Sequence, residues 1–151
     1  MKLAEALLLR SDLQTKLASL QQRINNNVLI QEGDELSEDP NALMGEAFSV
    51  NTELHHLIAK IHATNAQAKT STGQSMLSVL NTRDLLTQQH RIIQQAIDSS
   101  RRENGRYSSS EIRWVKTIAV ADLQKQADAI SQQLRQNILE IQASNWQIEL
   151  I

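Results

Sequence analysis

SDLQTKLASLQQRINNN, residues 11–27, carries the pattern on which the fold prediction depends. Its apolar residues Leu13, Leu17, Leu20 and Ile24 follow one another at alternating steps of four and three, which places them in one narrow stripe along an α-helix. The run of asparagines at its end favours helix termination, because their short amides compete for the backbone hydrogen bonds. We therefore predict a helix over about residues 2–27.

The same stepping of apolar residues recurs in three later segments, over about residues 40–69, 76–103 and from about 120 onward. The stripes are formed by Ala47, Val50, Leu54, Leu57, Ile61 and Ala68, by Val79, Leu86, Ile93 and Ile97, and by Leu123, Ala127, Ile130, Leu134, Ile138, Ile141 and Ile148. Thr70–Gly73 is expected to form a short turn, with Ser75 capping the third helix.

The composition supports long helices, since aromatic residues make up 3% of the chain, glycine occurs four times and proline once. A chain of 151 residues is expected to form one domain. We predict a mainly α protein, a single helical domain over residues 1–151, arranged as an antiparallel long-helix (four-helix) bundle or coiled coil.

Two long connections are predicted, VLIQEGDELSED at 28–39 and NGRYSSSEIRWVKTI at 104–118. In an up-and-down bundle both would emerge at the same end. Both contain β-branched residues, so we predict that they pair as a small β-ribbon. The first is acidic and the second basic, so ion pairs between them are also expected. An alternative stays open for 106–120, because Ser108 and Glu111 match a capping box that would start the fourth helix earlier.

The charge and the absence of cysteine narrow the functional classes. The net charge of -2 argues against attraction of nucleic acid or membrane by the whole surface, and without cysteine no disulfide or thiolate metal site can form. The N-terminal segment is predicted to be a helix and not a signal peptide, and no apolar run is long enough for a membrane span. We therefore expect a cytoplasmic protein with no membrane contact.

The basic segment 101–116 is the candidate binding surface. Its expected contact residues are Arg106, Tyr107, Arg113, Trp114 and Lys116. Arginines beside aromatic rings combine phosphate contact with base stacking, which is the alternative of nucleic-acid binding. Packing of Tyr107 and Trp114 at the end of the bundle is the interpretation we favour.

Four residues of ELHHLIAKIH form the candidate metal site. Glu53 and His56 have the E-x-x-H spacing of di-iron bundles, and His55 and His62 lie two turns apart on one helix face. A second E-x-x-H does not occur, so a surface histidine cluster is favoured over a zinc site between subunits.

Two further polar residues fall on or beside the apolar stripes. His90 and Asn145 are predicted to lie in a polar layer of the core or of a subunit interface, where a buried amide can specify register. No spacing assembles a nucleophile with its base, and the glycines are isolated, so neither an enzyme nor a cofactor is predicted.

The chain resembles, from end to end, the small bacterial helical proteins of uncharacterised function that are sometimes labelled septicolysin. The resemblance rests on MKLAEALLLRSDLQTKL, QEGDELSEDP, TRDLL, RYSSSEIRWVKT followed by LQKQAD, and NW near the C-terminus. It implies a compact, mostly helical, cytoplasmic bacterial protein with no catalytic residues to transfer. The favoured function is a non-catalytic interaction or scaffold bundle that forms a homo-oligomer, with a metal-binding bundle or enzyme, or nucleic-acid binding, as alternatives.

The label septicolysin implies pore formation, which the residues argue against. A cytolysin needs apolar helices or alternating strands that can span a bilayer, and residues 112–120 alternate weakly and carry Arg113 and Lys116. We expect the purified protein to leave red blood cells intact at every concentration tested by haemoglobin release. Lysis that depends on protein concentration would contradict this expectation.

Overall fold

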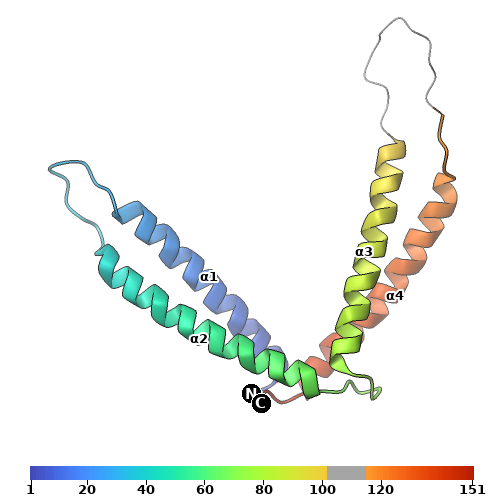
Figure 1. Ribbon diagram of the computed structural model, residues 1–151, viewed down its shortest axis with the longest axis horizontal. Helices are drawn as coiled ribbons and strands as arrows, with labels where there is room; N and C mark the ends of the chain where they lie inside the picture. Colours follow the sequence, from blue (N-terminus) through green and yellow to red (C-terminus); the bar gives the residue numbers. More distant parts are fainter. Residues whose placement is uncertain (102–114) are drawn as a thin grey trace, which may run out of the picture. The chain divides into compact units, whose positions relative to one another are not determined.

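The computed structural model describes residues 1–101 and 115–151, and it folds them into four long helices (Figure 1). They are α1 (Leu3–Asn27), α2 (Pro40–Gln67), α3 (Met76–Ser100) and α4 (Val120–Gln147). The prediction of a mainly α protein with four helices is confirmed, and each helix begins and ends within a few residues of the predicted bounds. The stop predicted at Asn104–Gly105 lies outside the described residues.

The chain divides into two compact units. Unit 1 consists of Met1–Lys69 together with Gln142–Ile151, and unit 2 consists of Thr70–Ile141. The last turns of α4 therefore belong to unit 1 and the rest of that helix to unit 2. A single domain over residues 1–151 and the packing of all four helices into one antiparallel bundle stay predictions.

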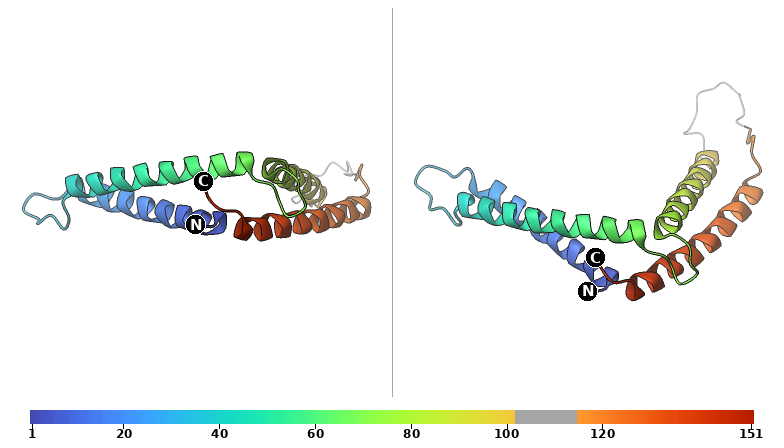
Figure 2. Two further views of the ribbon diagram at one scale, coloured as in Figure 1. Left: turned by 90° about the horizontal axis from the view of Figure 1, so that it is seen from below. Right: turned by 60° about the horizontal axis from the view of Figure 1, so that its bottom comes forward.

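Unit 1 is built on an antiparallel hairpin of α1 and α2, which lie side by side (Figures 1 and 2). Two ion pairs show the direction: Lys16 pairs with Glu46 at 2.8 Å, and Arg23, further along α1, pairs with Glu38. Between the helices lies a continuous apolar core of Leu3, Ala6, Leu13, Leu20, Ile24, Leu43, Ala47, Val50, Leu54, Leu57 and Ile61. The apolar residues that recur at steps of four and three in the sequence form this core seam.

The start of α2 shows why the helix begins there. Asp39 has extended backbone, and its side chain accepts a hydrogen bond from the N–H of Asn41 at 2.9 Å. Pro40 occupies the first helical position, where its missing N–H costs nothing and its fixed φ suits the helix. The Asp-Pro pair is therefore a helix-initiation signal.

Unit 2 contains α3 and most of α4, which run side by side in opposite directions (Figures 1 and 2). Asn137 of α4 donates a hydrogen bond to the carbonyl of Val79 at 3.2 Å. The predicted turn precedes α3: the N–H of Gly73 donates to the carbonyl of Thr70 at 2.9 Å, and Gly73 has φ +83°. The turn is tied to α4, since Thr72 donates to Glu140 at 2.5 Å.

The predicted β-ribbon is wrong for the first connection. Val28 continues the helical conformation, with φ -78° and ψ -12°, and its N–H bonds to the carbonyl of Ile24. Leu29 and Ile30 follow in an exposed loop without strand pairing. Glu38 of the acidic connection pairs with Arg23 of its own hairpin. The ion pairs expected with Arg106 and Arg113 of the second connection lie outside the described residues. The β propensity of Val28, Leu29 and Ile30 does not suffice for a strand, because a strand is stable only when a neighbouring strand satisfies its backbone hydrogen bonds.

The second connection contains no strand in its described part. Residues 115–119 are exposed and neither helical nor extended in a sheet, and α4 begins at Val120 as the sequence predicted. Ser108, Glu111 and the rest of the possible earlier helix start lie outside the described residues.

A pair of leucines in α1 tests the core seam. Leu20 is 1% exposed and Leu8 is 61% exposed. We expect Leu20→Ala to lower the free energy of unfolding by about 2–5 kcal/mol through lost burial and the cavity left behind. Leu8→Ala is the matched control and should change it by less than about 0.5 kcal/mol. Urea unfolding followed by far-UV circular dichroism measures both, and equal losses would contradict the assigned seam.

Candidate functional site

Most of the predicted basic surface lies outside the described residues, namely Arg106, Tyr107, Arg113 and Trp114. Lys116 is exposed within the described part of the connection. The binding role proposed for this segment therefore stays a prediction.

The four residues of the candidate metal site all lie on α2 and are exposed. His55 and His62 share one face of the helix, whereas Glu53 and His56 lie on its flanks. Within residues 1–101 and 115–151, no group of three or more His, Asp or Glu side chains is placed to hold a metal ion. The structure therefore does not bring these four residues together as one ligand set.

The two residues predicted to form polar layers are both half-buried. His90 lies on α3 beside the core residue Leu86, and Asn145 lies on α4 next to the buried Ser144. They are placed at the edges of the buried stripes. Their role in an interface stays a prediction.

Every helix carries a second regular stripe on the side opposite its core. These outer stripes consist of Leu8, Ser11, Thr15, Ala18, Gln22 and Asn25 on α1; Gly45, Phe48, Thr52, His55, Ala59, His62 and Ala66 on α2; Ser78, Asn81, Leu85, Gln88, Ile92, Gln95 and Ser99 on α3; and Ala129, Gln132, Gln136, Leu139, Ala143 and Trp146 on α4. All of these residues are exposed and none is Asp, Glu, Lys or Arg, but on α4 the same spacing continues before Ala129 to the exposed Lys125 and Asp122.

The outer stripes depart from what an exposed helix face usually contains. Charged residues make up 21% of the chain, and the solvent side of an amphipathic helix is where they normally gather. Here several large apolar side chains lie there instead, including Phe48 at 67% exposure. The alternation of three and four steps is the spacing by which helices pack against one another. The signal is present in the sequence as a second set of positions at helical spacing that lack Asp, Glu, Lys and Arg.

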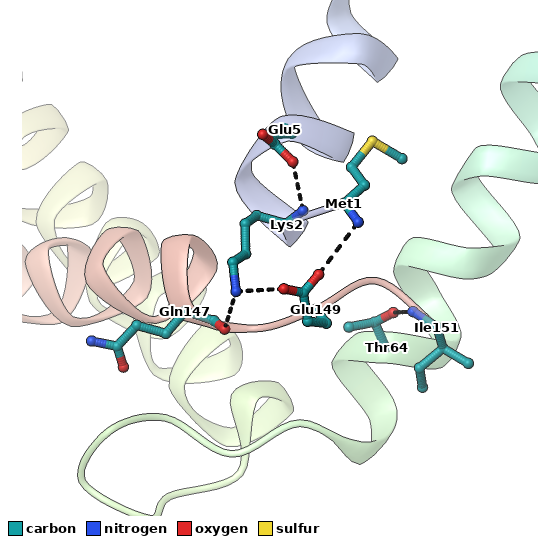
Figure 3. Close-up of polar contacts among 7 residues, drawn as sticks. All are labelled: Met1, Lys2, Glu5, Thr64, Gln147, Glu149 and Ile151. Atoms are coloured by element: carbon teal, nitrogen blue, oxygen red, sulfur yellow. Dashed lines mark hydrogen bonds and ion pairs between the residues drawn. The ribbon is translucent and has the colours of Figure 1, made fainter.

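The two ends of the chain meet in unit 1 and form what we call the terminal clasp, made by Met1–Leu3 and Ile148–Ile151 (Figure 3). Lys2 and Glu149 are antiparallel bridge partners, with backbone hydrogen bonds of 2.9 Å from Leu3 to Ile148 and from Leu150 to Met1. The clasp is fastened to α2, because the N–H of Ile151 donates to the Thr64 hydroxyl at 3.1 Å.

Ion pairs reinforce the terminal clasp. Glu149 accepts from the Lys2 ammonium at 2.5 Å and from the N-terminal ammonium of Met1 at 3.3 Å. The hydrogen bond from Lys2, with the nearby N-terminus, holds the pKa of Glu149 below its ordinary value of 4.5. Sequence reasoning missed this contact, since nothing local in either segment points to the other.

The opposite end of the hairpin is closed by a second polar contact. Arg23 reaches the Glu38 carboxylate with both Nε, at 2.9 Å, and Nη2, and Asn27 accepts from the Glu38 N–H at 3.2 Å. The hydrogen bond from Arg23 lowers the pKa of Glu38. Glu38, near the end of the acidic connection, is thereby held against the end of α1 and closes the hairpin.

The arrangement defines a helical protein whose distinctive feature is exposed uncharged helix surface. Comparison with known protein families assigns the chain to one of them. Residues 10–150 match the family described as "Family of unknown function (DUF6847)", and the chain belongs to this family.

A solved structure has the same fold over the whole chain. It is the crystal structure of a functionally unknown conserved protein from Corynebacterium diphtheriae, with 32% sequence identity and a TM-score of 0.88, covering 100% of this chain and 99% of that one. No curated protein matches the chain. Neither relative bears the label septicolysin, so that resemblance stays a prediction. In the described residues, no helix is both long and apolar enough to cross a membrane.

The terminal clasp should make part of the stability depend on pH. A carboxylate whose pKa is lowered by folding stabilises the fold above its ordinary pKa, and this contribution is lost as the pH falls through the lowered value. We expect Glu149→Gln to shift the urea midpoint downward at about pH 7, and we expect this deficit to shrink as the pH falls through the lowered pKa of the wild-type carboxyl. Glu53→Gln, at an exposed position of α2, is the matched control. A deficit that persists at acid pH would argue against the ion pair.

Proposed function

We propose that the protein is a non-catalytic interaction or scaffold protein of the bacterial cytoplasm, which self-associates through its helices. The observation that supports the proposal is the set of uncharged outer stripes. A helix that faces water on one side normally carries charge there, whereas a helix packed on two sides does not. The outer stripes of the four helices therefore favour contact with further helices.

In this proposal, the helices of each hairpin pack on each other through one face and on further helices through the opposite face. Each hairpin supplies one buried seam and two outer stripes, and an antiparallel bundle is completed by helices that cover the outer stripes. Contacts of this kind need neither a catalytic group nor a cofactor. They derive their free energy from burial of apolar surface and from close packing.

Self-association is tested by measuring mass against concentration. We expect multi-angle light scattering and sedimentation velocity, from about 1 to 100 µM, to show a mass above that of one chain that rises with concentration. Because the outer stripes carry no charge, added salt should leave the association intact, whereas phosphate contacts weaken steeply with salt.

Chelation supplies the control for a metal-bridged assembly. Incubation with EDTA should leave the mass distribution unchanged, because the proposed contacts contain no metal. A single-chain mass at every concentration would overturn the proposal, and loss of the assembly on chelation would replace it with a zinc-bridged one through the histidines of α2.

A further inference from the structure

We infer that the outer surface of α2 pairs with the same surface of a second copy, with the two helices antiparallel. The inference rests on the proposed self-association and assigns its surface, direction and register. The outer α2 surface is defined as the outer stripe of α2 with its two flanks. The flanks are Ala42, Ser49, His56 and Ala63 on one side and Met44, Asn51, Ile58 and Asn65 on the other.

The charges of α2 are confined to one row. Between Pro40 and Gln67 the charged residues are Glu46, Glu53 and Lys60, which succeed one another at heptad spacing. This row lies toward α1, since Glu46 pairs with Lys16. The rest of the exposed circumference has no carboxylate, lysine or arginine over the length of the helix.

The other three helices differ from α2 in their flanks. Charged residues border their outer stripes: Asp12 on α1, Asp84, Arg91 and Asp98 on α3, and Asp128, Arg135 and Glu140 on α4. Burial of such a flank against another helix would require each charge to find a partner. The outer α2 surface can be covered without that cost, which singles it out among the outer stripes.

The order of side chains in the stripe indicates that the occupant is a second copy. Small residues alternate with large ones: Gly45, Thr52, Ala59 and Ala66 form one row, and Phe48, His55 and His62 form the other. When two such helices run antiparallel, the row of large residues of one faces the row of small residues of the other. The surface is then complementary to itself, as a two-fold contact requires.

The register follows from this complementarity. With the two-fold axis between positions 53 and 54, Phe48 packs on Ala59 of the second copy, His55 on Thr52, and His62 on Gly45. Each layer joins one large and one small side chain. A parallel pair would set Phe48 against Phe48 and histidine against histidine, leaving the small residues with gaps between them.

The estimated area buried between the two α2 helices is that of a weak, transient interface. A standard interface buries about 1,600 Å² with 20–30 residues on each side, so the stripe and flanks of α2 correspond to roughly 900 Å² in total. This is at the weak end for a specific contact. A reversible dimer that forms as the concentration rises is therefore expected.

Cysteine cross-linking tests the surface and the direction, since the chain has no cysteine of its own. Thr52→Cys lies next to the two-fold axis and should be joined to its copy by a short bismaleimide. Ala66→Cys should not be, because its counterpart lies about 37 Å away along the helix. A mixture of Ala66→Cys with Asn41→Cys should give the cross-linked dimer, because position 66 lies opposite position 41. Cross-linking of Ala66→Cys to itself would overturn the antiparallel register.

A charge placed on the surface tests its contribution to affinity. Ala59→Glu puts a carboxylate at an exposed position of the outer stripe and should raise the dimer Kd at least roughly tenfold, because the charge would be buried without a partner. Ser19→Glu introduces the same charge at an exposed position of α1 outside the outer stripes and should leave the Kd unchanged. Equal helicity of the two variants shows that folding is unaffected.

The outcomes separate this inference from the proposed function. A dimer that survives Ala59→Glu and does not cross-link at Thr52→Cys would overturn the α2 contact and leave self-association standing. A single-chain mass for the unmodified protein at all concentrations would overturn both.

Discussion

The seam between α1 and α2 is the interaction on which the rest of unit 1 depends. Two helices that pack together along one seam can each bury only one narrow stripe, and here that stripe contains nearly all of their buried side chains. The opposite side of each helix is then left exposed. The outer stripes on these sides contain no Asp, Glu, Lys or Arg, and the stripe of α2 includes Phe48.

Polar contacts close the α1–α2 hairpin at both ends of its apolar seam. Glu38 closes one end of the hairpin through Arg23, and Glu149 closes the other through Lys2. Both carboxylates are paired with nearby cations on the surface, so they contribute to alignment more than to the total stability. The acidic first connection thus helps, through Glu38, to hold its own hairpin together.

The helices of unit 1 are distinguished by surfaces suited to packing. His55 and His62 are an example: their spacing resembles that of metal ligands, yet they belong to a row that alternates with glycine, threonine and alanine. In that row an imidazole is a large, flat side chain suited to a small neighbour. The family is described as one of unknown function and the protein from Corynebacterium diphtheriae as functionally unknown, so neither match supplies an activity to compare.

The sequence by itself determined the helices, because their stripes repeat at the helical period and their ends carry local signals such as Asp39–Pro40 and Asn25–Asn27. It did not determine which distant segments meet. The β-ribbon was predicted in part from Val28, Leu29 and Ile30, which instead form the end of α1 and an exposed loop without strand pairing. The terminal clasp went unseen, because the Lys2–Glu149 contact joins opposite ends of the chain. Local patterns depend on a few neighbouring residues, whereas pairing across the chain depends on where the packed helices bring their ends.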